Sequence, residues 1–225
     1  MQMLLRKRSF ALLWFGGLIS IMGDRVLAVA LPFFIYQQTR STLVTAILVA
    51  ATLIPRILLG STAGVLVDRW DRKRIMVVTS LGQGLILLPL LLVDSSAAVW
   101  IAYLVRFCQT VLAIFFGPAE TALLPQLVEK DQLLPANALN TLNNNIARLI
   151  GPPLGGVILA AVGLPGVVLF DSLTFLVAAG MIAGIRLPVN PAPAPAARPA
   201  PGRYRREWLE GMALIWKDRG VTMLF

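Results

Sequence analysis

Apolar blocks of roughly 20 residues recur along this 225-residue chain and are separated by short polar breaks. A helix of about 20 apolar residues crosses the hydrocarbon core of a membrane with all its backbone hydrogen bonds satisfied internally. Charged residues make up only 14% of the chain, whereas a water-soluble domain carries about 25%. The sequence therefore predicts an all-α membrane protein. We expect six transmembrane helices, at Phe10–Tyr36, Leu43–Val67, Ile75–Val93, Ala98–Pro118, Ala136–Val162 and Gly166–Arg186.

The net charge of +9 is explained by the side of the membrane on which the basic residues fall. If the N-terminus is cytoplasmic, 15 of the 20 Lys and Arg lie on the cytoplasmic side and only Arg40 lies outside. This asymmetry is typical of multi-pass membrane proteins, whose cytoplasmic loops retain positive charge. We therefore expect a cytoplasmic N-terminus and no nucleic-acid partner.

The residue types also exclude most catalytic and metal chemistry. The chain has no His and a single Cys108, so it offers no disulfide framework, no Cys/His metal site and no Cys/His nucleophile pair. No Gly-rich phosphate loop occurs. We expect neither an enzyme nor an ATP-driven pump.

Composition divides the chain into four parts. Residues 1–187 form the six-helix bundle, and residues 188–203 are a Pro/Ala-rich linker of extended conformation. Residues 204–220 carry apolar side chains at helical spacing among charged ones, which predicts an amphipathic cytoplasmic helix. Residues 221–225 begin a new apolar run, which we interpret as the start of a truncated seventh span. A natural half-transporter that dimerises is the alternative.

The break between the second and third spans carries the most specific pattern, in which Gly64, Asp68, Arg69 and Arg72 hold fixed spacings. A glycine permits close helix approach, and Asp68 can accept hydrogen bonds from a helix N-terminus. Positive-inside bias alone would explain the basic residues but not the glycine and the aspartate.

This segment resembles the major facilitator signature G-x-x-x-D-R-x-G-R-[RK], with Asp71 where that pattern usually has Gly. Two further elements resemble the same family: R-x-x-Q in the fourth span and the antiporter-associated G-P-x-x-G-G in the fifth. Residues 118–137 and 210–211 resemble the bacterial branch of proton-driven drug, macrolide and siderophore exporters. The residues that carry the two elements are Arg106, Gln109, Gly151, Pro152, Gly155 and Gly156.

The resemblance implies that the six spans are the N-terminal bundle of a twelve-helix fold, built from two inverted repeats of three helices. It implies a bacterial inner membrane, a small-molecule substrate, a missing C-terminal six-helix half, and a proton gradient in place of a cofactor. In the family the acidic loop residue latches the cytoplasmic side, a role that falls here on Asp68 with Arg69 and Arg72.

Six charged residues lie inside predicted spans, and each would cost roughly 2.5–3.5 kcal/mol at a lipid-facing midplane. Asp24 lies near the middle of the first span on a small-residue face, and Arg106 lies at a similar depth on a polar stripe of the fourth. We predict that Asp24 couples transport to protons, with Arg106 as its partner. Purely structural pairing is the alternative. The six residues are Asp24, Arg25, Arg56, Arg106, Arg148 and Asp171.

The fifth span has a polar face that includes Asn144 and Arg148, which either lines a cavity or forms hydrogen bonds between helices. In the same span, Gly151 and Pro152 should bend the helix, and Gly155 and Gly156 should pack against another span. We place Asp171 near the outer end of the sixth span, where water is accessible.

The pattern favours a proton-coupled exporter that works by alternating access. An importer or uniporter of the same fold, or a non-transporting scaffold or sensor, stays open. An intramembrane aspartyl protease built on Asp24 and Asp171 fits poorly, because the order of its motifs is reversed. The excess of intramembrane Arg favours anionic or neutral cargo, whereas the resemblance favours hydrophobic drugs or siderophores.

Overall fold

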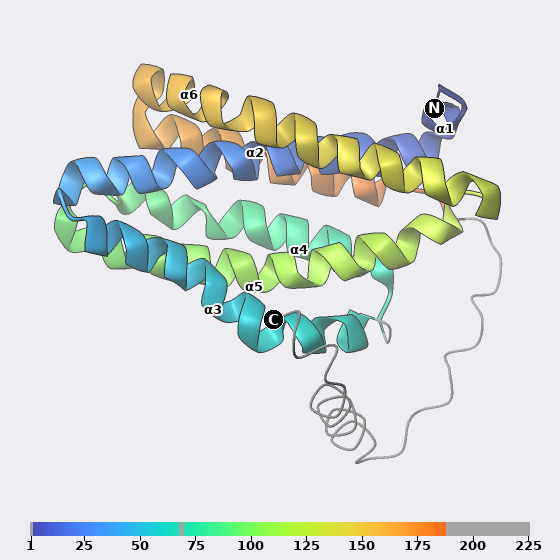
Figure 1. Cartoon of the computed structure of the whole chain (residues 1–225), viewed down its shortest axis with the longest axis horizontal. Coiled ribbons are helices and arrows are strands. Elements are labelled where there is room, and N and C mark those ends of the chain that lie inside the picture. Colours follow the sequence, from blue (N-terminus) through green and yellow to red (C-terminus); the bar gives the residue numbers. More distant parts are fainter. Residues whose placement is uncertain (1, 68–69, 188–225) are drawn as a thin grey trace, which may run out of the picture. The chain divides into compact units, whose positions relative to one another are not determined.

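The computed structural model describes residues 2–67 and 70–187, and its regular structure in those residues is entirely helical (Figure 1). The predicted linker, amphipathic helix and seventh span therefore lie outside the described residues, as do Asp68 and Arg69. The α-helices are α1 (Gln2–Arg6), α2 (Arg8–Thr39), α3 (Thr42–Val67), α4 (Arg72–Ile86), α5 (Val99–Leu123) and α6 (Leu133–Ala183). Short 3₁₀ turns are η1 (Leu88–Leu92), η2 (Ser96–Ala98), η3 (Leu124–Gln126) and η4 (Lys130–Gln132).

Helix α6 consists of two segments that meet at Gly163. The φ of Gly163 is 68° and its ψ is −171°, a combination that is essentially restricted to glycine. Pro165 follows two residues later and cannot continue the hydrogen bonding of the preceding helix. The predicted break at residues 163–165 is thus confirmed.

The first segment of α6 runs parallel to α2. Near its start, the backbone oxygen of Leu139 accepts a hydrogen bond from the Trp14 indole at 3.0 Å. Further along, Gly151 lies directly against Arg25. Residue numbers therefore increase together along the two helices.

The second segment of α6 runs antiparallel to α2. Thr174 lies against Gly23, and the backbone oxygen of Arg186 accepts a hydrogen bond from Ser9 at 2.9 Å. The chain consequently reverses at Gly163, as Figure 1 shows at the turn from yellow to orange. Five helices among the described residues are long and apolar enough to cross a membrane, and this reversal makes six crossings of them, as predicted.

Helix α2 packs most extensively against the two segments of α6, while α4 packs against both α5 and α6 and α3 packs mainly against α5. Close packing of α2 depends on glycines of α6. A Cβ on Gly155 would lie 2.6 Å from the backbone oxygen of Val26, and one on Gly151 would collide with the Arg25 side chain. Small residues at such positions let membrane helices approach closely. The predicted packing role of Gly155 is therefore confirmed.

The buried apolar side chains form two separate clusters along the bundle. One contains Val26 to Ile35 of α2 with Leu164 to Phe175 of α6, and the other contains Phe10 to Trp14 of α2 with Ala119 to Leu124 near the end of α5. Seven of the ten buried polar residues lie on their helices between the members of the two clusters and form a polar layer: Ser20, Thr79, Ser80, Gln83, Gln109, Thr110 and Asn143. The other three, Asp171, Ser172 and Thr174, lie between Val168 and Phe175 of the cluster that contains Val26.

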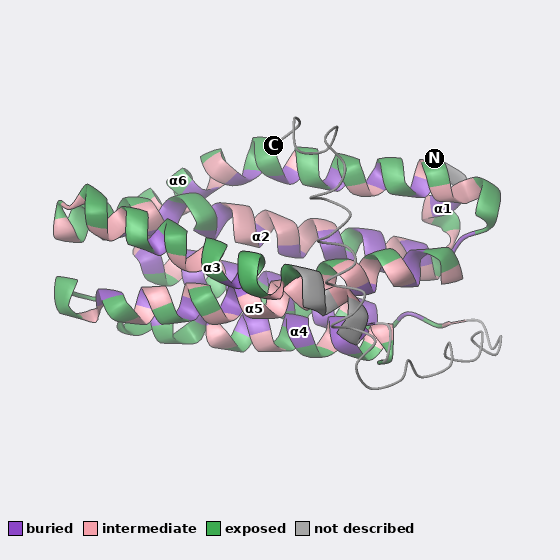
Figure 2. Cartoon of the chain, turned by 60° about the horizontal axis from the view of Figure 1, so that its bottom comes forward, coloured by how far each residue is buried: buried purple, intermediate pink, exposed green. Residues whose placement is uncertain are grey.

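Helix α3 is the least buried of the long helices, and Figure 2 shows it mostly exposed. Large apolar side chains such as Ile57 and Leu58 face outward on it. On a soluble protein these residues would be an aggregation hazard, but in a bilayer they face lipid.

The structure corrects three sequence-based expectations. A Cβ on Gly64 or on Gly156 would meet no described atom within 4 Å, so neither glycine mediates a close helix contact in the described part of the chain. The helix continues without interruption through Pro152, and the bend expected there stays a prediction. Helix α5 continues past Pro118 to Leu123, which places Glu120 inside the helix rather than in a loop.

Candidate functional site

The centre of the polar layer is a contact between α2 and α5. Arg106 Nη1 lies 3.4 Å from Asp24 Oδ1, and Gln109 Nε2 donates to the same oxygen at 3.4 Å. Gln109 lies one helical turn after Arg106, and its Oε1 accepts a hydrogen bond from Arg106 Nη1. The predicted pairing of Asp24 with Arg106 is confirmed, and Gln109 joins it.

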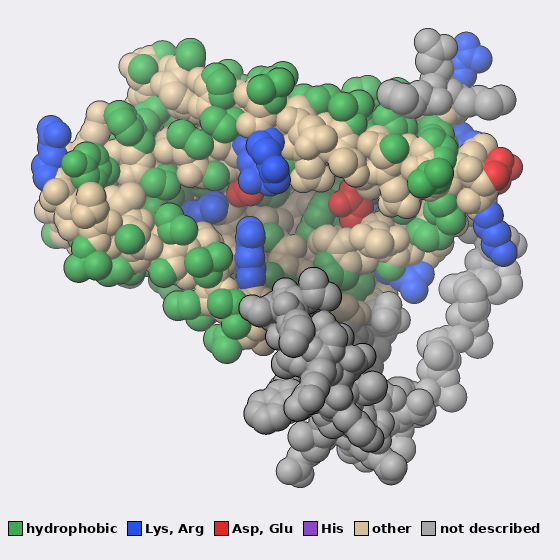
Figure 3. Space-filling view, viewed as in Figure 1, with side chains coloured by type: hydrophobic (Ala, Val, Ile, Leu, Met, Phe, Trp, Pro, Cys, Tyr) green, Lys and Arg blue, Asp and Glu red, His purple; other side chains and the backbone are tan. Residues whose placement is uncertain are grey.

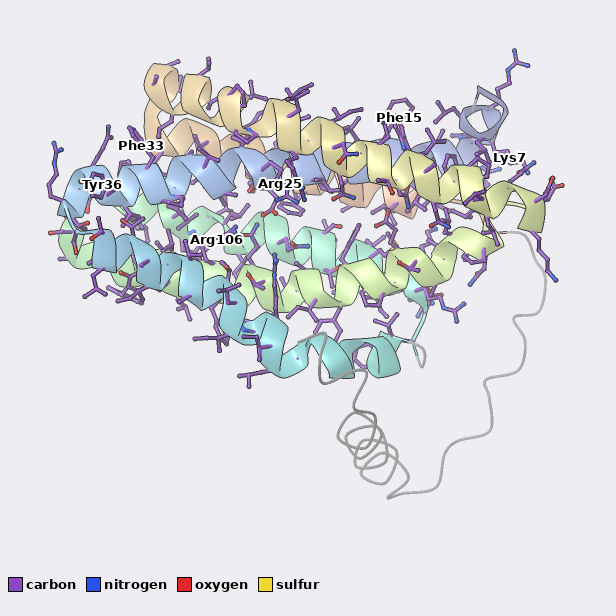
Figure 4. The ribbon with its side chains drawn as sticks, in the orientation of Figure 1. Lys7, Phe15, Arg25, Phe33, Tyr36 and Arg106 are labelled. Atoms are coloured by element: carbon purple, nitrogen blue, oxygen red, sulfur yellow. The ribbon has the colours of Figure 1, made fainter. Side chains whose placement is uncertain are left out.

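The two charges differ in exposure, which matters for chemistry. The Asp24 side chain is 39% exposed and that of Arg106 is 13% exposed. Figure 4 places Arg106 on α5, on the side of that helix that faces α2. The carboxylate is therefore the more open of the two groups, while the guanidinium that neutralises it is held largely inside the bundle.

Asp171 belongs to the same site, contrary to the expected position near the outer end of the sixth span. It is fully buried, and it lies within electrostatic reach of both Asp24 and Arg106. Its Oδ1 accepts a hydrogen bond from Thr174 at 3.3 Å, and its Oδ2 has no hydrogen-bond partner among the described residues. Gly23 creates the space, since a Cβ there would overlap the Asp171 carboxylate.

The sequence contained a signal that Asp171 is buried, although its distance from the end of the span did not predict this. Asp171, Ser172 and Thr174 form a short polar run within an otherwise apolar segment, and all three are buried. Seven residues separate Asp171 from Leu164, which is about 10 Å along a helix. That depth brings it level with Gly23.

The other intramembrane arginines do not join this contact. Arg56 and Arg148 are exposed and form no ion pair in the part of the chain that the structure describes. The buried Nε of Arg25 has no described hydrogen-bond partner. Among the predicted intramembrane charges, only Arg106 neutralises a carboxylate.

The polar face of α6 divides into two parts. Asn137, Thr141, Asn144 and Arg148 are exposed, and the first three bond only to backbone oxygens of their own helix. Hydrogen bonds between helices are therefore not the role of these three residues in the described chain. Figure 3 shows basic and acidic side chains near the middle of a face that is otherwise rich in hydrophobic groups.

Asn140 and Asn143, on the inner side of α6, do bond across helices. Asn140 Nδ2 donates to Glu120 Oε1 at 3.4 Å, and Asn143 Nδ2 donates to the backbone oxygen of Trp14 at 2.9 Å. Of the interpretations left open for this span, cross-helix bonding applies to these two amides.

The loop before α4 is organised by Asp71, the residue that departs from the family pattern. Its backbone is extended, with φ −64° and ψ 111°, and its carboxylate accepts a hydrogen bond from the Arg74 N–H at 2.8 Å. Asp71 is thus the N-cap of α4, where Asp is among the preferred residues. Lys73 donates to the backbone oxygen of Ile185 at 2.7 Å. This bond connects the first turn of α4 with the segment just after α6. Arg72 is the first residue of α4.

An ion pair outside the predicted spans connects the start of α2 with the segment before α6. Lys7 Nζ lies 2.8 Å from Glu129 Oε1 and donates to Gln132 at 2.7 Å. The hydrogen bond and the charge of Lys7 lower the pKa of Glu129. Because Glu129 is exposed, the pair is a modest tether.

Comparison with known proteins identifies the family. A family model described as transmembrane secretion effector matches residues 3–200. The chain belongs to this family of major facilitator transporters. The family assignment and the all-helical six-crossing bundle agree with the sequence-based prediction of an N-terminal half.

Several curated relatives are similar to this chain over most of its length. Macrolide efflux protein A of Streptococcus pyogenes is 26% identical over 224 residues, which are 97% of this chain and 54% of the relative. The enterobactin exporter EntS of Salmonella paratyphi A is 29% identical, over 82% of this chain and 45% of the relative. The staphyloferrin A transporter of Staphylococcus aureus is 26% identical, over 83% and 48%. No solved structure matches the chain.

The chain spans about half the length of these relatives. All three are named as transporters or exporters, which are not enzymes, in agreement with the sequence-based expectation. The family and the apolar helices together make this a multi-pass protein of a bacterial membrane.

Proposed function

We propose that this chain is the first six-helix half of a secondary transporter that exports small hydrophobic compounds in exchange for protons. The observation that carries the proposal is the contact of Asp24 with Arg106 and Gln109 in the polar layer between two apolar clusters. Ionisable groups inside a membrane are costly, so they tend to mark ion and substrate pathways.

Asp24 is the proposed coupling residue. When Asp24 is ionised, the guanidinium of Arg106 attracts it across 3.4 Å and holds α2 against α5. When Asp24 takes a proton, that attraction is lost and the two helices can separate. With an effective dielectric constant of 20, the Coulomb term at this distance is about 5 kcal/mol before desolvation is counted. Desolvation and the partial exposure of Asp24 offset part of it, so the net effect of protonation on the conformational equilibrium is smaller than this value.

The exposed polar face of α6 supports a water-filled cavity beside the coupling site. A stripe containing Asn144 and Arg148 would be expensive against lipid, yet neither side chain is covered by the described helices. We propose that this stripe lines the substrate cavity. The C-terminal six-helix half would close the other side, as the length of the relatives supports.

Movement of the bundle would be guided by the glycine contacts and by the loop before α4. Gly151 and Gly155 let α6 lie directly on α2, and such a smooth surface suits small sliding motions. Gly156 does not take part in this contact, and the helix continues through Pro152. We therefore propose that α6 slides on α2 at Gly151 and Gly155. The gate role of Asp68, Arg69 and Arg72 in the loop, with Gly64 before it, stays a proposal from the resemblance.

Export rather than import is supported by the names of two relatives, a macrolide efflux protein and an enterobactin exporter. Macrolides and siderophores are the cargo classes that these names suggest. An importer or uniporter remains the alternative within the same fold, and a scaffold or sensor is the alternative outside it. We place the protein in the bacterial inner membrane with a cytoplasmic N-terminus, on the distribution of Lys and Arg.

The energy source that we propose is the proton gradient, with no cofactor. No group of three or more metal-ligating side chains occurs within the described residues. Asp24 and Asp171 provide carboxylates near the middle of the bundle, and carboxylates can carry protons.

The test is transport by the full-length protein in lipid vesicles with an imposed proton gradient, using a fluorescent macrolide and a siderophore as probes. We expect Asp24→Asn to abolish gradient-driven transport, while Glu129→Gln, which removes an exposed carboxylate, keeps it. Gradient-driven transport at the wild-type rate in Asp24→Asn would exclude Asp24 as the coupling residue. Failure of the wild-type protein to move either probe would favour the scaffold.

A further inference from the structure

Glu120 occupies an unexpected place inside the bundle. It lies on α5, and its carboxyl group faces α2 at Gly17, where a Cβ would lie 3.7 Å from Glu120 Oε1. On the other side it faces α6, from which Asn140 donates to the same oxygen. Gly17 precedes Asp24 by seven residues, so Glu120 lies about 10 Å from Asp24 along α2.

The polar groups around Glu120 contain more acceptors than donors. Asn143 is 2% exposed, and its Nδ2 is committed to the backbone oxygen of Trp14. The Oδ1 atoms of Asn140 and Asn143 are both buried and have no hydrogen-bond partner among the described residues. An ionised Glu120 would add further acceptors to this cluster, because a carboxylate has no proton to donate. Buried acceptors without donors are unfavourable, because they have lost their hydrogen bonds to water.

No cation among the described residues compensates for the missing donors. Neither ion pair of the described chain involves Glu120. The described charged residues on the helices packed around it, and on α5 itself, lie elsewhere along those helices. They are Arg8, Asp24 and Arg25 on α2, Arg56 on α3, Arg72, Lys73 and Arg74 on α4, Arg106 on α5, and Arg148 and Asp171 on α6.

We propose that Glu120 is a proton-binding site, whose neutral acid donates a hydrogen bond to the side-chain oxygen of Asn140 or Asn143. Protonation removes the charge of this half-buried carboxyl group and supplies the donor that the two amides lack. The carboxyl group and the amide of Asn143 both lie against α2 at Gly17, where a Cβ would be 3.7 Å from Glu120 Oε1 and 3.8 Å from Asn143 Nδ2. The site is separate from the Asp24 contact, and it stands whether or not Asp24 couples transport.

Placing Glu120 on a proton path rests on the proposed function. If protons travel between Asp24 and the end of the bundle that carries Lys7, Glu120 lies on that route. Opening this end would let water reach Asn140 and Asn143, replace the acid O–H as their donor, and release the proton.

Infrared spectroscopy of the intact protein in lipid tests the proposal directly, because a protonated carboxyl group has its own carbonyl stretching band. At neutral pH we expect wild type to show this band, and Glu120→Gln to lose one component of it. The amide N–H of Gln can still donate to the asparagine oxygens, so the variant should fold. Glu129→Gln is the matched control and should leave the band unchanged, because Glu129 is exposed and ion-paired. An identical band in wild type and Glu120→Gln would overturn the proposal.

A second measurement needs no variant. A hydrophobic carbodiimide reacts with neutral carboxyl groups in apolar surroundings, and peptide mass spectrometry locates the adduct. We expect modification of Glu120 and not of Glu129 at neutral pH, and less at high pH. Absence of an adduct on Glu120 would overturn the proposal even if the Gln variant failed to fold. Neither the infrared band nor the carbodiimide adduct depends on transport. A failed transport assay would therefore count against the proposed function and not against protonation of Glu120.

Discussion

The neighbouring glycines Gly155 and Gly156 provide a controlled test of how α6 packs on α2. A Cβ on Gly155 would lie 2.6 Å from the backbone oxygen of Val26 and 3.2 Å from its Cα. A Cβ on Gly156 would meet no described atom within 4 Å. The same chemical change, Gly→Ala, can therefore be made at adjacent positions with and without the contact.

The magnitude follows from the geometry. Ordinary van der Waals contact begins at 3.4 Å, so Gly155→Ala requires α6 and α2 to separate by about 0.8 Å at this point. Overpacking of this kind costs about 1–3 kcal/mol. Both variants gain the same helix propensity, about 1 kcal/mol for Gly→Ala, so this gain cancels in their difference. We expect Gly155→Ala to be about 1–3 kcal/mol less stable than Gly156→Ala.

The assay is reversible unfolding of the protein in mixed micelles, followed by circular dichroism and tryptophan fluorescence. Trp14 is a suitable reporter because its indole bonds to Leu139 across the same pair of helices. Equal unfolding free energies for the two alanine variants would refute the close contact between α2 and α6 at Val26. Gly155→Ala more stable than Gly156→Ala would refute it as well.

Two further predictions concern the ends of the bundle. Gly163→Ala should destabilise the protein by about 1–3 kcal/mol, because its φ of 68° and ψ of −171° suit only glycine; unfolding in the same micelles checks this, and an unchanged stability would contradict the reversal at Gly163. Lys7 lowers the pKa of Glu129, so their contact adds stability above the ordinary pKa of a glutamate and loses it as the pH falls through the lowered value. In carbon-detected NMR titrations, Glu129 should titrate below an ordinary glutamate in wild type and return to the ordinary range in Lys7→Met; the same midpoint in both proteins would contradict the ion pair.

Much of the fold was predictable because the membrane limits the choices. Helices must satisfy their own backbone hydrogen bonds in lipid, so the length and spacing of apolar blocks indicate the spans directly. The break at residues 163–165 was predictable for a related reason, since Gly and Pro together interrupt a helix. The pairing of Asp24 with Arg106 was predictable from cost, because two opposite charges at similar depth within membrane spans stabilise one another.

The depth of Glu120 and Asp171 was not predictable in the same way. Hydropathy placed Glu120 in a loop because Pro118 and several polar residues follow the apolar block, yet α5 continues to Leu123. It placed Asp171 near water because only its distance from the end of a span was considered. The first error arises because hydropathy does not report where a helix ends. The second arises because hydropathy does not report how far one helix is shifted along its neighbour.

Hydropathy and short motifs of fixed spacing were enough to predict a six-crossing helical membrane protein and its family. Which polar groups share a site became clear only from the packing, because it depends on the register between helices distant in sequence. Gly23 lets Asp171 approach the Asp24 contact, and the register of α5 and α6 brings Glu120 beside two unsatisfied amides. A glycine contributes no side chain to a sequence pattern, so its effect on the site becomes visible only when the neighbouring helix is in place.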